Sequence, residues 1–372
     1  MIRSAKGMLI GLSVVLYLGM TEVALGAEIN TAGKLFLLNP GARASGLGGG
    51  SALLGEAFSG LYNPASLTRI SDLAGGIYYH SKPYYVTGYE YVVFSAAART
   101  EFGCLAMNYL TRDGVESTNL PPEEAAAFLM AGSPLKRLSL GVGFKILTSK
   151  KANFVAVNEA PGNTYKMAFD LGAAYYGLLP QATFGKPLIS EDDLRRTLGG
   201  PFPRGFSFAL AIQNLGGRVK YDYSIDIEML PQTFRADWLW GIYEDRWLSC
   251  IAVGELEKLL VSRNRNGGYN AATDAIFQAW GGGEMEGGWT SRLGFELDAL
   301  CFFAVRLGWS VEHKEHRSFT HFGIGLGPQW LRASVAWVRQ PGSDAKWRDG
   351  ARYDLTANVT FERVQRWMNL QR

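Results

Sequence analysis

The sequence predicts an antiparallel β-barrel that spans a membrane, and three observations support this fold class. The chain has 372 residues, of which 45 are glycine, 13% are aromatic and 19% are charged, whereas soluble domains carry roughly 25% charged residues. Long segments alternate apolar and polar residues. After Met20, no run reaches the roughly 18 apolar residues that a spanning helix needs. A helical membrane protein is therefore excluded, and 47% hydrophobic residues exclude a disordered chain.

The N-terminus has the pattern of an export signal. Arg3 and Lys6 precede the apolar stretch Met8–Met20, which is too short to span a bilayer. Small residues follow at Ala24–Ala27, where a signal peptidase would cut. We therefore expect residues 1–27 to be removed, and the mature chain to be secreted, periplasmic or inserted as a barrel.

The alternating segments have the period of a strand with two different faces. In Leu138–Leu147, apolar residues occupy every second position, with serine, glycine and lysine between them. The same pattern recurs in Tyr165–Tyr175, Phe206–Gln213, Phe303–Glu312 and Tyr353–Phe361. These segments exceed the roughly 5 or 6 residues of an average strand and approach the roughly 9 to 11 that cross a bilayer.

Alternation alone fits a soluble β-sandwich as well, because its strands also bury one face. Aromatic residues at the strand ends favour the membrane barrel, since such residues form girdles at the two interfaces. They include Tyr165, Tyr175, Trp238, Trp240, Trp330, Trp337, Tyr353 and Phe361. We therefore expect a barrel in the outer membrane of a diderm bacterium, with membrane lipid as its surroundings.

Fifteen segments are candidate strands, although bacterial barrels use even numbers. One segment is therefore wrong, or two form a single strand, and we expect 14 strands within residues 75–361. The connection 178–205 would lie on the periplasmic side, and a tail at 362–372 would hang out, or the last strand would run on. The candidates are residues 75–82, 86–98, 101–111, 124–132, 138–149, 165–176, 206–214, 232–241, 246–256, 273–283, 289–297, 302–312, 319–326, 329–338 and 353–361.

Residues 28–74 precede the barrel and are rich in glycine. The glycines allow positive φ and close backbone approach, and Asn63-Pro64 initiates a turn. A phosphate-binding loop is disfavoured because no Lys-Ser or Lys-Thr follows the glycines and no strand precedes them. Because the inward strand faces are mostly small, we expect a hatch in or near the lumen. Its candidate residues are Gly41, Arg43, Gly46, Gly48, Gly49, Gly50, Tyr62, Asn63, Pro64 and Ala65.

Other function classes find little support in the sequence. The net charge is +3 and basic residues are spread out, so no nucleic-acid footprint is present. Cys104, Cys250 and Cys301 fit neither a disulfide framework nor a zinc site. The histidines at 313–316 and His321 could bind a metal, but solvated loop histidines are the favoured interpretation. We expect no enzyme, no cofactor and no metal.

The pre-barrel motifs resemble the PorV/PorQ family of type IX secretion and the wider FadL-like group of 14-stranded barrels. The family's opening motif, approximately G-A-R-A-x-G-M-G-G-A, is similar to Gly41–Gly50, and Y-x-N-P-A-G-L is similar to Tyr62–Leu67. An acidic pair of the family is replaced by Glu56-Ala57-Phe58, and the arginine-bearing strand resembles Ala304–Gly308. A more specific PorV-like feature comprises Gln213, Asn214, Leu215, Gly216, Leu230, Pro231 and Arg235.

The resemblance implies a barrel that binds exported proteins by their C-terminal signal domain. It would carry them from the type IX translocon barrel to the surface-attachment machinery. Candidate contact loops are Asn119–Glu124, Asn264–Tyr269 and Gly342–Gly350. The alternative is a FadL-like transporter of hydrophobic small molecules, which predicts an apolar pocket beneath the outer loops. A structural barrel without transport is a third interpretation.

Overall fold

The computed structural model describes most of the chain after residue 32. The predicted signal peptide and the predicted C-terminal tail lie outside the described residues. The structure describes residues 33–50, 52–70, 72–81, 90–113, 122–135, 137–150, 163–179, 206–220, 227–244, 247–262, 272–280, 287–300, 302–328, 330–339 and 349–359.

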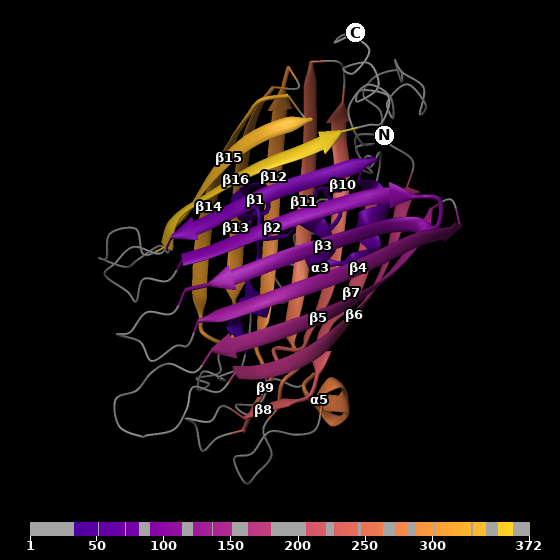
Figure 1. The fold of residues 1–372 in the computed structure, drawn as a ribbon. Coiled ribbons are helices and arrows are strands. Elements are labelled where there is room, and N and C mark those ends of the chain that lie inside the picture. The colour runs from indigo at the N-terminus through magenta and orange to yellow at the C-terminus, as the bar shows by residue number, and fades with distance from the viewer. Residues whose placement is uncertain are drawn as a thin grey trace.

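Fourteen strands form a closed antiparallel barrel, in which β1 pairs with β16 and thereby closes the wall. Every other wall strand pairs with its neighbours in chain order (Figure 1). The wall strands are β1 (Leu73–Ser81), β2 (Glu90–Thr100), β3 (Gly103–Arg112), β4 (Glu123–Leu135), β5 (Leu138–Lys150), β6 (Asn163–Leu179), β7 (Phe206–Gly216), β10 (Thr233–Glu244), β11 (Leu248–Leu259), β12 (Trp289–Ala299), β13 (Phe303–Glu312), β14 (Arg317–Leu326), β15 (Leu331–Arg339) and β16 (Asp349–Val359).

The two ends of the barrel differ. At one end, Leu73 of β1 pairs with Val359 of β16, and short turns such as residues 101–102 join neighbouring strands. We call this the terminal end; the connection from β6 to β7 leaves from it. The opposite end, the loop end, carries the hairpin of β8 (Arg218–Lys220) and β9 (Ile227–Met229) and the helix α5 (Ala272–Gln278) (Figure 1). Because short turns face the periplasm in such barrels, the loop end faces the cell exterior.

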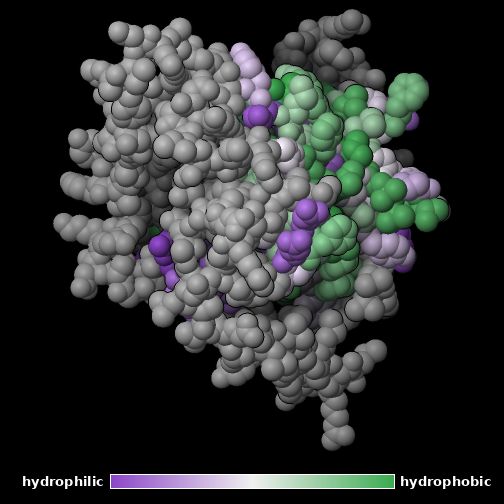
Figure 2. All heavy atoms as spheres, turned by 90° about the horizontal axis from the view of Figure 1, so that it is seen from below, coloured by the Kyte–Doolittle hydropathy of each residue, from purple (hydrophilic) through white to green (hydrophobic). Residues whose placement is uncertain are grey.

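The wall is apolar outside and polar inside, as the alternating pattern predicts. Outward side chains such as Met107 (57% exposed) and Leu307 (46% exposed) are large and uncovered, whereas Ser139, Asp170 and Arg306 face the lumen and are buried. Figure 2, a view onto the loop end, shows hydrophobic residues along one flank of the molecule. A closed wall with an apolar exterior is the structure that a bilayer accepts. The chain is therefore an outer-membrane barrel.

Among the described residues, no helix combines the length and the apolar character that a bilayer-spanning helix requires.

One of the fifteen candidate strands is wrong. Residues 273–283 begin with the helix α5 instead of a strand. Asp274 lies in its first turn, where a carboxylate favours the helix dipole. Ala275 and Ala279, four residues apart, are both fully buried, so the short apolar run has a helical face. The short strands β8 and β9 were not predicted, because three residues are too few to show a period of two.

Replacing outward-facing Leu171 by arginine tests the position of the wall in lipid. Leu171 lies midway along β6 and is 51% exposed. We expect Leu171→Arg to lower the free energy of unfolding in lipid vesicles by about 2–4 kcal/mol, because a charge near the bilayer midplane is costly. Denaturant titration measures this change, and Leu171→Met serves as the control with little effect. An arginine that leaves the stability unchanged would place this face in water.

Candidate functional site

The N-terminal segment, defined as residues 33–70, lies inside the ring of strands (Figure 1). It comprises η1 (Lys34–Leu37), α2 (Ala42–Gly46), α3 (Ser59–Tyr62) and η2 (Pro64–Arg69). Helix α2 contacts β13 to β16, whereas η2 contacts β3 to β6 on the opposite arc of the wall. The segment therefore crosses the lumen from one side to the other.

Glycines on the wall make room for the backbone of the N-terminal segment. A Cβ atom at Gly308 would collide with the backbone nitrogen of Gly48, and a Cβ atom at Gly141 would collide with that of Ala65. The segment has matching glycines. Gly48 has a φ of 88° in the left-handed region, and an added Cβ would lie 2.7 Å from the carbonyl oxygen of Trp309. Segment and wall thus touch backbone to backbone.

Other predicted hatch glycines also lie at contacts with the wall. An added Cβ on Gly46 would lie 3.0 Å from Cα of Gly323, and one on Gly50 would lie 3.3 Å from Cβ of Glu255. Gly41 precedes α2, and Gly49 follows it with a φ of 105°. The predicted glycines therefore gather around α2, where the segment approaches the wall most closely.

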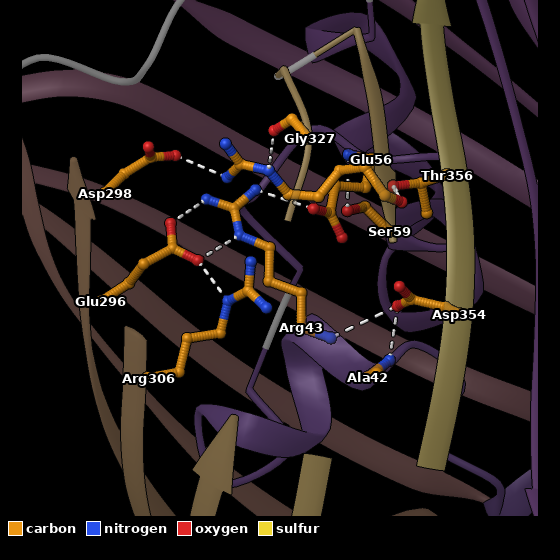
Figure 3. Close-up of polar contacts among 11 residues, drawn as sticks. Ala42, Arg43, Glu56, Ser59, Glu296, Asp298, Arg306, Gly327, Asp354 and Thr356 are labelled. Carbon is orange, nitrogen blue, oxygen red and sulfur yellow. Dashed lines mark hydrogen bonds and ion pairs between the residues drawn. The ribbon is translucent and has the colours of Figure 1, made fainter. Parts of the chain in front are cut away.

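Arg43 is the central charge of the segment and is buried (Figure 3). Its guanidinium forms two hydrogen bonds to Glu296 of β12, at 2.7 and 2.5 Å, and an ion pair with Glu56 at 2.8 Å. Arg306 of β13 donates to the same Glu296 carboxylate at 2.6 Å. Burial lowers the pKa of Arg43, but the attraction of Glu296 and Glu56 outweighs it, so the pKa is raised above its usual value. The guanidinium therefore stays charged.

The backbone of α2 is held by the same part of the wall. The amide nitrogens of Ala42 and Arg43 donate to Oδ2 of Asp354, at 2.5 and 3.3 Å (Figure 3). These amides open a helix and have no partner within it, so a carboxylate at this place is favourable. His321 of β14 bonds with the carbonyl oxygen of Ser45 at 2.8 Å. Together with the bond from Arg43 to Glu296 of β12, the short helix α2 is thus bound to three strands of the wall, β12, β14 and β16.

A second charged group holds the stretch around Tyr62. Arg235 of β10 pairs with Glu257 at 2.6 Å and donates to Oδ1 of Asn39 at 3.0 Å. Its guanidinium carbon lies 5.3 Å from the centre of the Tyr62 ring, within cation–π range. Arg292 of β12 completes the group through Glu255 and Glu257. The predicted hatch residue Tyr62 and the predicted family residue Arg235 are therefore in contact.

The Asn-Pro-Ala motif fixes the turn into η2 and attaches it to the wall. The Oδ1 atom of Asn63 accepts from the amide nitrogen of Ala65 at 2.9 Å, and Pro64 occupies the first helical turn. The Nδ2 atom of Asn63 donates to the carbonyl oxygens of Leu210 and Ala173, at 2.9 and 3.3 Å. This side chain thus caps a helix and binds two wall strands.

The Gln-Asn-Leu-Gly motif at the end of β7 binds the same segment. Nε2 of Gln213 donates to the carbonyl oxygen of Leu61 at 2.7 Å. Asn214 has a φ of 58°, and its Nδ2 donates to the carbonyl oxygen of Pro231 at 3.0 Å. Gly216 leaves room for buried Leu230, because an added Cβ would collide with that side chain. Of the family residues, Leu215 alone contributes mainly through its pairing with a wall strand.

The wall charges that hold the segment were missed as candidates. Glu296, Glu255 and Arg292 each lie at inward positions of strands whose other face is apolar. Charged residues at such positions are the signal that would have found them. Glu56, which stands where the resembled family has an acidic pair, contacts Arg43 together with Glu296 of the wall.

The histidine prediction is wrong for His321, which is buried in the lumen and bonds with Ser310 at 2.8 Å. His313, in the turn after β13, bonds with Ser291 at 2.7 Å, and burial together with the nearby His316 lowers the pKa of His313. Within the described parts of the chain, no three potential ligands come together for a metal ion. Histidine at these places serves hydrogen bonding.

One predicted contact loop is also partly wrong. Glu123, within Asn119–Glu124, is buried, pairs with Arg112 at 3.2 Å and accepts from the amide nitrogen of Leu35 at 3.1 Å. It faces the lumen because it begins β4 at an inward position. The loops 264–269 and 342–348 lie outside the described residues.

Cys104 is buried and Cys250 half-buried, and both are free thiols.

No protein-family model matches this sequence, and no curated protein matches it. Solved structures with a similar fold include a Pseudomonas aeruginosa FadL homologue, with 11% identity over 90% of this chain and 99% of that one, and a TM-score of 0.49. The Pseudomonas putida toluene transporter TodX shows 10% identity over 85% of this chain and 96% of its own, with a TM-score of 0.44. The Ralstonia pickettii toluene transporter TbuX shows 8% identity over 86% and 98%, with a TM-score of 0.43. The fold of this chain rests on its own strand pairing.

Removing the charge of Glu296 tests the hold on Arg43. We expect Glu296→Gln to destabilise the seated segment by about 3–5 kcal/mol, because it leaves Arg43 and Arg306 buried without their shared carboxylate. Glu315→Gln breaks an exposed ion pair with Arg317 and serves as the control, with an expected change below about 1 kcal/mol. Trypsin cleavage at Arg43 in the folded barrel measures the release. Equal protection of both variants would contradict the expected role of this ion pair.

Adding a methyl group to a wall glycine tests the backbone contact independently of charge. We expect Gly308→Ala to weaken the seating of the segment by about 1–3 kcal/mol, because the methyl group collides with Gly48. Gly132→Ala is the control, since a Cβ there meets no atom within 4 Å. The same trypsin assay reports the difference, and a Gly308→Ala barrel that resists cleavage as the wild type does would oppose this account.

Proposed function

We propose that the chain is a PorV-like component of type IX protein secretion. It binds exported proteins through their C-terminal signal domain and carries them from the translocon to the surface-attachment machinery. The observation that supports this function best is the filled lumen, which is crossed by residues 33–70 and held on both sides. A barrel closed in this way acts through its surfaces, and its chemistry is binding.

The contacts make displacement of the segment costly. Arg43 of the segment pairs with buried Glu296 of the wall. Asn39 and Leu61 of the segment accept hydrogen bonds from Arg235 and Gln213 of the wall. Breaking one buried pair by removing a partner costs about 3–5 kcal/mol, and release of α2 would separate Arg43 from Glu296 and Glu56. A rigid closed barrel instead presents its loops in a fixed arrangement, which is how scaffolds commonly carry binding function.

The interlocked motifs also support the family interpretation. The glycine-rich and Asn-Pro-Ala elements are shared across the wider group, whereas Gln213–Gly216 and Leu230-Pro231 resemble PorV more specifically. In space, Gln213 binds Leu61 and Arg235 binds Asn39. The PorV-like residues therefore serve to keep the shared elements seated, which suits a barrel whose lumen stays closed.

Affinity purification of the tagged barrel from detergent-solubilised outer membrane tests the proposal. We expect a large translocon barrel, or a cargo protein with a C-terminal signal domain, to co-purify. Replacing residues 264–269 by a glycine-serine linker should reduce cargo recovery at least several-fold while the barrel keeps its folded mobility on gels. A barrel that brings down lipid alone, from an organism that exports such proteins, would refute the proposal.

A FadL-like transporter of hydrophobic small molecules is the second candidate, and one observation favours it. Leu35 and Phe36 of the segment pack against an inward-facing apolar wall that includes Tyr78, Tyr91 and Leu147. Apolar residues are unusual on the inner face of a barrel, which is commonly polar. An apolar molecule would find a site there once the segment moved. Faster cellular uptake of a hydrophobic compound in the Glu296→Gln variant than in the wild type would support this second function over the first.

A further inference from the structure

Helix α5 lies at the loop end of the barrel (Figure 1), and Trp280, which follows it, lies on the outer surface of the wall. The position follows from strand pairing. Lys258 of β11 stands opposite Phe234 of β10 and Trp289 of β12, so these three side chains share one face. Their neighbours Arg235, Glu257 and Thr290 occupy the alternate, inward positions. Phe234, Lys258 and Trp289 therefore form an outward row.

Trp280, which follows α5, packs on this outward row. Its ring centre lies 5.1 Å from that of Phe234 and 5.9 Å from that of Trp289. Both distances are within the range of favourable aromatic pairs. Trp280 also donates its indole N–H to the carbonyl oxygen of Ile276 at 2.5 Å, which ties the ring to α5. The helix is thereby fixed against the outside of the wall and does not cover the lumen.

Lys258 shows what this arrangement protects. It faces outward, yet it is 1% exposed. Its Nζ atom donates to the carbonyl oxygen of Gly287 at 2.7 Å and lies 5.2 Å from the centre of the Trp289 ring. An uncovered ammonium group on the outer wall would be costly where the wall meets hydrocarbon. The aromatic cover around Lys258 is therefore suited to a low-dielectric surrounding.

The outer face of α5 is apolar and uncovered. Ala275 and Ala279 are fully buried, whereas Phe277 is 82% exposed and Trp280 is 43% exposed. Phe277 and Trp280 are three residues apart and share one side of the helix. Leaving a phenylalanine side chain in water forgoes a substantial hydrophobic gain, so this face fits an apolar environment better than an aqueous one.

The apolar face of α5 is continuous with the lipid-facing wall. Leu256 lies two residues from Lys258 on the same outward face and is 43% exposed. We propose that Phe277 and Trp280 form an interfacial anchor that inserts into the outer leaflet of the membrane. Its partner is the lipid surface, at the depth where headgroups meet acyl chains. Amphipathic helices and tryptophan side chains favour that depth, and the polar Asp274 and Gln278 stay in contact with headgroups and water.

The anchor fixes the height of the loop end above the membrane. Trp280, which follows α5, packs on Phe234 of β10 and Trp289 of β12, so insertion of Phe277 holds this rim against the leaflet. The loops of the loop end then lie at a fixed height above the membrane surface. The inference concerns lipid alone, and it holds for either function proposed above.

Spin labels on α5 test the anchor in the folded barrel. Cys104, Cys250 and Cys301 are first replaced by alanine, and a label is attached at Phe277→Cys or, as the matched control, at Gln278→Cys. The barrel is reconstituted into vesicles of phosphatidylethanolamine and phosphatidylglycerol. We expect the label at 277 to collide several-fold more often with oxygen than with a neutral nickel chelate, because oxygen concentrates in lipid. The label at 278 should show the opposite preference.

Two outcomes would overturn the proposal. If both labels collide equally with the nickel chelate, α5 stands in water. If the label at 277 is shielded from oxygen and nickel alike, a protein covers this face in place of lipid. Folding of each variant is checked by its heat-modifiable mobility on gels, and the high exposure of Phe277 makes its replacement compatible with a folded barrel.

Discussion

The structure depends on one constraint: a chain segment that carries charge into a closed barrel must find an opposite charge on the wall. Arg43 enters the lumen on α2 and meets Glu296, which also serves Arg306. A buried guanidinium without a carboxylate would be strongly unfavourable. Glu296 of the wall therefore helps to define where the N-terminal segment sits.

The N-terminal segment also needs space inside the barrel, and small residues on the wall provide it. Fourteen strands enclose limited space, and backbone can enter only where the inner face lacks side chains. Gly141 and Gly308 lie where the segment approaches most closely, on opposite arcs of the wall. Among the described residues, glycines thus serve both the turns of the segment and the wall positions that face it. A larger side chain at a contact glycine of the segment or of the wall would therefore need a compensating change in the other.

The fold class was predictable because alternation is a local signal, whereas the partners inside the lumen were not. Asn63 and Gln213 were found as motif residues, but their binding to the wall and to Leu61 depends on which strands lie opposite in the closed ring. Glu296 is an ordinary glutamate in the local pattern, and only barrel register brings it to Arg43. Residues 273–283 were mistaken for a strand because the apolar run in that window suits either structure, and the helical face of Ala275 and Ala279 emerges only from packing.

A filled lumen moves the functional surfaces to the outside of the molecule. What remains for recognition is the loop end and the outer wall, and α5 joins the two. Trp280 after the helix packs on Trp289, whose ring lies beside Lys258, while α5 itself exposes Phe277. A protein that hands cargo between membrane partners requires a fixed orientation in the membrane plane, because partners embedded in the same bilayer can meet it only at matching heights. The proposed anchor on α5 supplies that height, because Trp280 ties the helix to strands β10 and β12 of the wall.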